Sequence, residues 1–262
     1  MSDALIVERE GRVVTLVNDD APRNRMSLDF VDELEAQVDA LAKDDSVGAV
    51  VIRGAGDEHF SVGMNLKQIP EGAKRKGNFE ALLDQRLRVI SKIENMSKPW
   101  IATMYGYCLG GGLELPLGCH FRLAAEEGAK IGLPELDLGS IPAWGGTARL
   151  TRSVGRAAAL DIILRVKMIS GPEALRIGLV HEVWPNDELQ QRAQDLAHEL
   201  AAKPPNAVAA VLRCVVGAEG ASLDEALRVE RQEVRRTQGS AEMQEGMRAF
   251  LEKRDPNFFP DA

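Results

Sequence analysis

The chain has 262 residues, of which 45% are hydrophobic and 27% charged, and its formal net charge is −8. This length suits one large domain, or a domain with a smaller appendage, and the composition is typical of a folded protein. The excess of acidic residues argues against nucleic acid as a partner, because most of the surface repels a polyanion.

The cysteines and the amino terminus bear on the cellular compartment. Cys108, Cys119 and Cys214 are widely spaced and lack the pattern of a zinc site or a disulfide framework. The opening MSDALIVERE lacks the apolar core of a signal peptide, and no apolar run reaches transmembrane length. We therefore expect a cytoplasmic protein with no membrane partner.

The first part of the chain alternates strand and helix patterns. Residues 4–10 and 12–18 are rich in β-branched residues and predict a hairpin. Ser27 can cap a helix that runs to about Lys43, because apolar residues recur there every three or four positions. The apolar run 47–52 predicts a buried strand.

The middle of the chain contains a loop pattern and two further strand regions. Residues 70–79 are polar, basic and contain glycine, so we expect a mobile surface loop before a helix over 79–96. An apolar strand over 100–107 leads into three glycines and a short helix that begins near Leu113. A strand pair is expected around 121–132.

The last third of the chain is mainly helical in pattern. Ser-x-x-Glu sequences at 170–173 and 222–225 have the spacing of helix capping boxes. Two consecutive prolines at 204–205 end the preceding helix, and two or three amphipathic helices follow. We therefore predict a core domain over 1–202 and a helical region over 203–262.

Glycines and carboxylates gather where predicted strands end. Residues 107–114 place three glycines before Glu114, where backbone N–H groups can point at a substrate oxygen. The segment 60–66 also contains glycine, so two N–H donors can converge on one carbonyl oxygen. Glu135 follows a proline in an apolar stretch, where loss of hydration should raise the pKa of its carboxyl.

Each of these residues also has an explanation without chemistry. A glycine-rich turn can serve packing alone, and Glu114 is favoured by the dipole in the first turn of a helix. Glu135 can be an exposed acid, and solvation is the better interpretation for Asp137. A lone histidine such as His120 is more often a hydrogen-bonded structural residue than a catalyst. Spacing alone leaves these alternatives open.

Taken together, the segments resemble the crotonase (enoyl-CoA hydratase/isomerase) superfamily. The resemblance lies in FSVGMNL, in KPWIATMYGYCLGGGLEL and in AKIGLPELDLGSIPAWGGTARL, and it continues through SGPEALRIGLVHEVWP to the closing EGMRAFLEKRDPNF. It implies an α/β fold, a spiral of ββα turns followed by a C-terminal helical region that mediates trimer formation. A homotrimer or a dimer of trimers is implied in the same way.

The resemblance also implies a reaction, the hydration of a 2-enoyl-CoA thioester to the 3-hydroxyacyl-CoA. Glu114 would act as base toward a bound water, and Glu135 would deliver a proton to Cα. The backbone N–H groups of Met64 and Gly111 would form the oxyanion hole, and the N–H of Ala143 would help hold the water. Coenzyme A is part of the substrate, and no metal or other cofactor is implied.

Other residues are implied to contact the substrate or its CoA: Arg25, Met26, Lys67, Trp144, Phe250 and Lys253. Phe250 and Lys253 would reach the CoA of a neighbouring subunit. The chain departs from the family pattern at Asn65, His120 and Trp144. The ring of Trp144 can shorten the acyl pocket, stack on an unsaturated acyl group, or simply pack in the core.

Three other functions compete with hydration. The same fold supports enoyl-CoA isomerases and acyl-CoA hydrolases, although the presence of both glutamates favours hydration. A non-catalytic CoA-binding or RNA-binding relative would not need both glutamates, and RNA binding would predict a basic face. A nicotinamide oxidoreductase is disfavoured, because the three glycines lack the GxGxxG spacing.

Overall fold

The computed structural model describes residues 4–259 and contains two β-sheets. The strands are β1 (Leu5–Glu10), β2 (Val13–Asn18), β3 (Ala49–Gly54), β4 (Trp100–Met104), β5 (Tyr107–Leu109), β6 (Phe121–Ala125), β7 (Lys130–Gly132) and β8 (Glu182–Trp184). The larger sheet has the order β1-β2-β3-β4-β6-β8, with β1 antiparallel to β2 and every other pair parallel. The smaller sheet pairs β5 with β7 in parallel.

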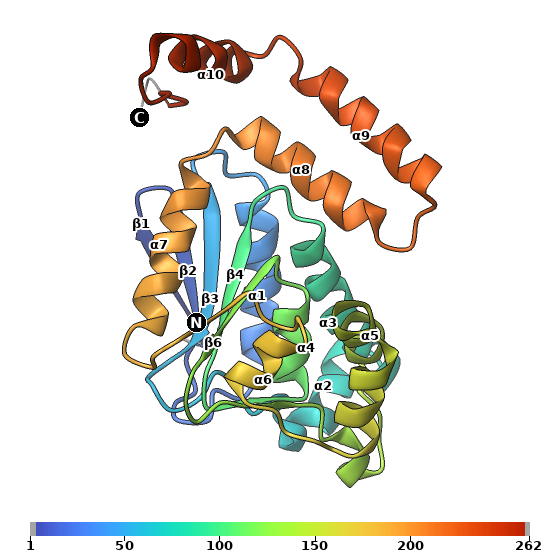
Figure 1. The fold of residues 1–262 in the computed structure, drawn as a ribbon. Coiled ribbons are helices and arrows are strands. Elements are labelled where there is room, and N and C mark those ends of the chain that lie inside the picture. Colours follow the sequence, from blue (N-terminus) through green and yellow to red (C-terminus); the bar gives the residue numbers. More distant parts are fainter. Residues whose placement is uncertain (1–3, 260–262) are drawn as a thin grey trace.

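Helices cover the larger sheet or lie beyond one end of it. They are α1 (Leu28–Leu41), α2 (Ile69–Lys76), α3 (Phe79–Glu94), α4 (Gly111–Leu117), α5 (Gly146–Leu164), α6 (Gly171–Arg176), α7 (Leu189–Ala201), α8 (Pro205–Ala218), α9 (Leu223–Thr237) and α10 (Ala241–Glu252), with short 3-10 turns η1 (Leu66–Gln68) and η2 (Glu135–Leu138). In Figure 1, α7 covers one face of the sheet, and α1 and α4 lie on the other side. No helix within residues 4–259 is long and apolar enough to cross a membrane.

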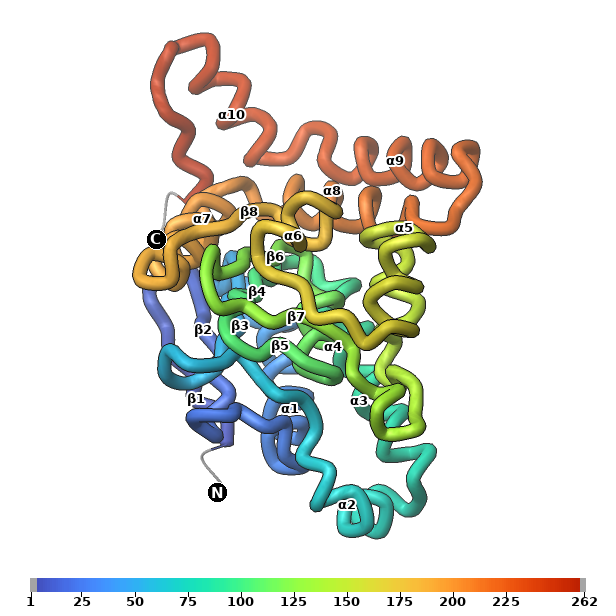
Figure 2. Tube along the Cα trace, turned by 60° about the horizontal axis from the view of Figure 1, so that its bottom comes forward, coloured from blue at the N-terminus to red at the C-terminus, as the bar shows by residue number. Residues whose placement is uncertain are grey.

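Successive strands step from the larger sheet to the smaller one and then into a helix. β4 is followed by β5 and α4, and β6 is followed by β7 and, after η2, by α5. Figure 2 shows β5 and β7 side by side next to α4. Single bridges from Ser61 to Cys108 and from Ile131 to Ile169 extend the smaller layer on both sides. The expected α/β fold, a spiral of ββα turns with helices at its C-terminal end, is confirmed.

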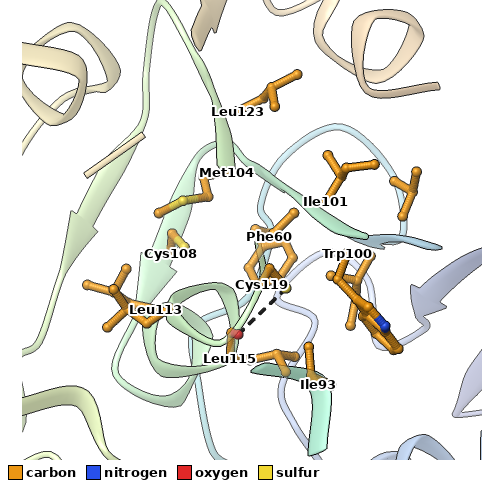
Figure 3. Close-up of a cluster of buried hydrophobic side chains, with 14 of the residues drawn as sticks. Phe60, Ile93, Trp100, Ile101, Met104, Cys108, Leu113, Leu115, Cys119 and Leu123 are labelled. Atoms are coloured by element: carbon orange, nitrogen blue, oxygen red, sulfur yellow. Dashed lines mark hydrogen bonds between the residues drawn. The ribbon is translucent and has the colours of Figure 1, made fainter. Parts of the chain in front are cut away.

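A buried apolar cluster joins α4 to the larger sheet (Figure 3). Trp100 and Met104 on β4 and Leu123 on β6 are completely buried, and Leu113 on α4 and Phe60 pack in the same cluster. Burial of each such side chain contributes roughly 1.5–3 kcal/mol relative to exposure. This packing fixes the start of α4, which carries Glu114.

Several sequence predictions for the first part of the chain are confirmed. β1 and β2 form the expected hairpin around Gly11, which has a φ of 55°. Ser27 caps α1, because its side chain accepts a hydrogen bond from the N–H of Phe30 at 3.0 Å. The helix ends at Leu41, slightly before the expected end at Lys43.

The prediction of a mobile loop over 70–79 is wrong, because residues 69–76 form α2. Pro70 stands in its first turn, where the missing N–H costs nothing. Arg75 forms ion pairs with Asp29 and Asp32 of α1, at 2.6 Å and 2.9 Å. The basic residues that suggested a loop therefore attach the helix to α1.

The apolar stretch 100–107 is not one strand. It breaks at Gly106, whose φ is 50° and where a side chain would collide with the carbonyl of Glu58. The following helix α4 begins at Gly111 instead of Leu113.

Two further expectations need correction, one on strand pairing and one on helix capping. The strands expected around 121–132 lie in different sheets, β6 in the larger and β7 in the smaller. Ser170 caps α6 by accepting from the N–H of Glu173, but the Glu173 carboxylate binds Lys167, so no complete capping box forms there. The box of Ser222 with Glu225 is complete.

Candidate active site

A cavity of about 370 Å³ opens where α4, η2 and the segment before α5 meet the segment around Met64 and the start of α3. Its lining includes the two predicted glutamates and mostly apolar neighbours: Val62, Gly63, Met64, Leu66, Ile69, Phe79, Leu83, Gly110, Gly111, Glu114, Pro134, Glu135, Leu138, Ser140, Ile141, Ala143 and Trp144. An apolar cavity with a few convergent polar groups is typical of a site for a small molecule.

Glu114 lies in the first turn of α4 and is only 2% exposed. Its Oε1 accepts hydrogen bonds from the N–H groups of Trp144, at 2.7 Å, and Gly146, at 2.8 Å. Burial raises the pKa of this carboxyl to about 7, although the two N–H donors favour its anion and lower the pKa. Glu114 can therefore gain or lose a proton near neutral pH.

Glu135 begins η2 and faces the same cavity. Its Oε2 is buried and has no hydrogen-bond partner within residues 4–259. The other oxygen packs against Gly110, where a Cβ would lie 2.9 Å from it. Burial raises the pKa of Glu135, as its apolar sequence context predicted.

The surroundings of the two carboxyls differ in one respect. Glu114 accepts two backbone hydrogen bonds, which stabilise its charged form, whereas the unpartnered oxygen of Glu135 gains nothing from ionisation. The two donors stabilise the anion that a base at Glu114 needs, and burial favours the neutral form that an acid at Glu135 needs.

Two backbone N–H groups at the cavity wall are unused. Neither the N–H of Met64 nor that of Gly111 donates a hydrogen bond to any residue in the part of the chain that the structure describes. Both residues line the cavity, and Gly111 is the first residue of α4, so the helix dipole adds to its N–H. The arrangement can bind a carbonyl oxygen that develops negative charge.

Glycines bring these two N–H groups together. Gly63 has a φ of 88°, and a Cβ built on it would lie 2.6 Å from the carbonyl oxygen of Leu109 and 3.3 Å from the nitrogen of Gly111. Hydrogen bonds from Ser61 to Tyr107 and from Leu109 to Ser61 hold the two segments side by side. Only glycine fits this close approach without strain.

Trp144 and Ala143 form the wall beside Glu114. The Trp144 ring, 4% exposed, lies against Gly111 so closely that a side chain there would collide with it. The N–H of Ala143 donates no hydrogen bond to any described residue, 4–259, so it is free to hold a water in the cavity.

Comparisons with known proteins identify relatives of this chain. A family model for enoyl-CoA hydratase/isomerase matches residues 9–260. The chain is 38% identical over 259 residues to a probable enoyl-CoA hydratase of Bacillus subtilis, with 97% of each chain covered. It is 35% identical to the 2,3-dehydroadipyl-CoA hydratase of Escherichia coli over 255 residues, covering 97% of this chain and 98% of that one.

Solved structures show the same relationship. An enoyl-CoA hydratase crystal structure from Geobacillus kaustophilus superimposes with a TM-score of 0.92 at 31% identity, covering 98% of this chain and 97% of that one. The chain belongs to the enoyl-CoA hydratase/isomerase family. It therefore has the crotonase fold, and its family acts on CoA thioesters.

The residues of this family member that are expected to contact CoA differ in their burial and in their contacts. Arg25 forms an ion pair with Asp20 at 2.6 Å, and Lys67 is exposed in η1. Met26 is buried, and its backbone pairs with the oxyanion segment, its N–H donating to Gly63 and its carbonyl accepting from the N–H of Asn65. None of these side chains lines the cavity itself.

The two C-terminal residues of the predicted site lie on α10 and just after it. Phe250 is 82% exposed, and neither it nor Lys253 lines the cavity of its own chain. Their predicted contact with a neighbouring subunit's CoA stays a prediction.

His120 and Asp137 lie outside the chemistry of the hydratase/isomerase site. The Nδ1 of His120 accepts a hydrogen bond from the N–H of Trp100 at 3.0 Å, and burial lowers its pKa to about 4. It is thus a neutral structural residue, as predicted. Asp137 is exposed, which matches its interpretation as a solvated carboxylate.

Sequence reasoning missed two residues that hold Glu114 in place. Gly146 supplies one N–H donor, and Arg149 binds the Trp144 carbonyl at 3.0 Å while it forms an ion pair with Glu94 at 2.7 Å. The signal for the first was the Gly145-Gly146 pair at the start of α5, since helix amino termini offer free N–H groups to anions. No local pattern indicated the pairing of Arg149 with Glu94.

Proposed function

We propose that this chain hydrates the 2,3-double bond of a 2-enoyl-CoA thioester and yields the 3-hydroxyacyl-CoA. The observation that carries the proposal is one cavity in which two carboxyls, the buried Glu114 and the partly buried Glu135, face the N–H groups of Met64 and Gly111, which have no hydrogen-bond partner among residues 4–259. The names of the relatives from Bacillus and Escherichia point to the same reaction.

In the proposed reaction the thioester oxygen accepts hydrogen bonds from Met64 and Gly111. A water held by Ala143 N–H and Glu114 attacks Cβ, and its proton passes to Glu114. The electrons of the double bond move toward the thioester carbonyl, and the resulting enolate takes a proton at Cα from Glu135. Proton exchange between the two carboxyls then restores the starting state.

Substrate binding sets the protonation that this reaction needs. An acyl group in the cavity removes water from around the partly exposed Glu135, and this loss of hydration raises its pKa further. The two N–H donors of Glu114 oppose the effect of burial on its pKa and stabilise the anion that the proposed base needs. The oxyanion hole lowers the barrier by roughly 2.7–4 kcal/mol per donor.

Neither a metal ion nor a further cofactor takes part in the proposed reaction. Within residues 4–259, no three His, Cys, Asp or Glu side chains are placed to hold a metal ion. We expect turnover of crotonyl-CoA to be unchanged after dialysis against a chelator, and a loss that added divalent metal restores would contradict this part of the proposal.

Product analysis separates hydration from the other reactions of the fold. Crotonyl-CoA and a 3-enoyl-CoA are incubated separately with the protein in ¹⁸O-labelled water, and the masses of the products are measured by mass spectrometry. Hydration adds one labelled water to crotonyl-CoA while the thioester stays intact. Free CoA thiol would indicate a hydrolase, and a 3-enoyl-CoA converted without gain of mass would indicate an isomerase. Either result without hydration would overturn the proposal.

A further inference from the structure

Trp144 lines the cavity beside two of the groups that the proposed reaction uses, Gly111 and Glu114. Its ring packs on Gly111, whose N–H is one of the two carbonyl donors, and its own N–H binds Glu114 at 2.7 Å. With the carbonyl at Gly111 and Cβ beside Glu114, the next carbon atoms meet the indole ring.

The backbone of Trp144 is held on both sides. Its N–H donates to Glu114, and its carbonyl accepts from Arg149 at 3.0 Å. Arg149 in turn is fixed by Glu94 and Ser91. A shift of this segment to admit a longer chain would also move the proposed base, Glu114. We therefore expect the backbone of Trp144 to keep its position.

Behind the ring there is almost no space. Trp144 also lines a second, small hollow of about 10 Å³, whose other lining residues are Met26, Phe30, Val31, Leu34, Arg86, Val89, Ile90 and Leu115. The Arg86 guanidinium lies 5.9 Å from the centre of the indole ring and is 2% exposed. It donates to the carbonyl of Leu82 and the amide oxygen of Gln85, and its Nε has no partner within residues 4–259. Among residues 4–259 the hydrogen bonds of this guanidinium go to neutral groups, and a buried cation disfavours an apolar chain end beyond the ring.

We propose that Trp144 is a specificity-determining residue that closes the acyl end of the cavity, so that this chain acts on 2-enoyl-CoA thioesters with a short acyl group. The inference rests on the proposed hydration. The indole ring takes up the room for the carbons that follow Cβ, and in an apolar pocket each misfitting methylene changes kcat/KM by about 10-fold or more.

The test compares kcat/KM for crotonyl-CoA with kcat/KM for 2-octenoyl-CoA in wild type, Trp144→Ala and Trp144→Phe. We expect the wild type to prefer crotonyl-CoA by at least about 10-fold, Trp144→Phe to keep that order, and Trp144→Ala to lose most of the preference. The ratio of two substrates on one sample is independent of the folded fraction, so partial misfolding of a variant does not obscure the result.

Leu138→Ala is the matched control, because Leu138 lines the same cavity but at its mouth, where it is 64% exposed. It should leave the chain-length ratio unchanged. A wild type that hydrates both substrates equally, a Trp144→Ala variant that slows both by the same factor, or a ratio that moves only in Leu138→Ala would overturn the inference and place the acyl chain at the mouth.

Binding distinguishes this inference from the proposed reaction. Calorimetric titration with the unreactive butyryl-CoA and octanoyl-CoA measures the length of the pocket without turnover. The wild type could hydrate nothing and still bind butyryl-CoA more tightly than octanoyl-CoA. If only Trp144→Ala then removes that difference in affinity, the proposed reaction is wrong but the role of Trp144 in limiting acyl length is supported. Equal affinity of the wild type for both ligands would contradict the inference that Trp144 closes the acyl end of the cavity.

Discussion

Glu114 combines deep burial with two N–H donors, and these have opposite effects on its proton. Burial has the larger effect and brings the pKa to about 7, far above its ordinary value of 4.5. A carboxylate buried in this way is costly to the folded protein but is a stronger base than a solvated one. Function and stability therefore make opposite demands on this residue.

The pH dependence of turnover follows from that pKa. Below about pH 7 Glu114 is protonated and no longer accepts the proton of water, so kcat/KM for crotonyl-CoA should fall, approaching tenfold per pH unit. The measurement is kcat/KM from about pH 5 to about pH 9, with circular dichroism to show that the protein stays folded. A profile that is flat through pH 7 would rule out Glu114 as the base.

Replacing Glu114 with Gln should stabilise the protein, but only above a certain pH. The raised pKa means that the folded state holds a proton that the unfolded state releases as pH rises from about 4.5 to about 7, so the wild type loses stability across this window. The glutamine side chain keeps an oxygen for both N–H donors and never ionises. The variant should gain up to about 3 kcal/mol in the free energy of unfolding at pH 8 and almost nothing near pH 4.

Denaturant unfolding of both proteins at the two pH values checks this. Asp137→Asn serves as the control, since the exposed Asp137 shows no comparable burial. An equal gain for Glu114→Gln at both pH values would contradict a raised pKa.

At this scale the sequence predicted that Glu114 and Glu135 lie in one site, but not what holds them, and Arg25, Met26 and Lys67 do not line the cavity. The apolar neighbours of Glu135 in the sequence predicted its raised pKa. Burial raises the pKa of Glu114 as well. The donors to Glu114 lie thirty and thirty-two positions further along the chain, at Trp144 and Gly146. Such contacts depend on how η2 and α5 fold back over α4, and no local pattern encodes that.

At the scale of the elements, the oxyanion hole depends on the close approach of two segments at Gly63. Gly63→Ala adds a Cβ 2.6 Å from the carbonyl oxygen of Leu109, and this should push the segments apart and lower kcat/KM by roughly 100-fold, about the effect of losing one N–H donor. Crotonyl-CoA hydration measures the effect.

Gly56→Ala is a matched control for backbone strain. Gly56 also has a positive φ, 70°, but a Cβ there meets nothing within 4 Å. It should cost some stability and leave kcat/KM nearly unchanged. If both variants lose activity equally, left-handed backbone strain and not the approach of the two segments would be responsible.

Element predictions succeeded where one face of an element is buried and failed where tertiary contacts decide. The periodicity of α1 and its Ser27 cap were enough to place that helix. In contrast, α2 is polar along most of its length, and it is held by Arg75 and Lys76 through ion pairs to α1. Its basic residues suggested a loop because their partners lie more than forty positions earlier in the chain.

For the molecule as a whole, the C-terminal helices are the part with the most exposed apolar surface. α8 packs with α9, and α10 stands apart from the core in both views (Figures 1 and 2). Large apolar side chains on these helices are at least 46% exposed: Val211, Val215, Leu223, Leu227, Val234, Met243, Met247, Phe250 and Leu251. Apolar surface on this scale favours contact with another chain.

We expect the protein to assemble as a homotrimer or a dimer of trimers through these helices. Light scattering coupled to size exclusion measures the mass, and Phe250→Asp should shift it toward the monomer. Leu175→Asp, which changes an apolar residue of α6 that is 44% exposed, is the control and should leave the mass unchanged. A wild-type monomer at all concentrations would contradict the assembly. The boundary between a core over 1–202 and a helical region over 203–262 stays a prediction.

The most direct test of hydration by two glutamates is the loss of the enoyl-thioester absorbance of crotonyl-CoA, measured for wild type, Glu114→Gln, Glu135→Gln and Asp137→Asn. We expect rapid loss in the wild type and in Asp137→Asn, and a decrease in kcat of ~10²–10⁴ in each glutamate variant, with CoA binding retained. Full activity in either glutamate variant, or a folded wild type that binds CoA and leaves crotonyl-CoA unchanged, would contradict a hydratase that works with two glutamates.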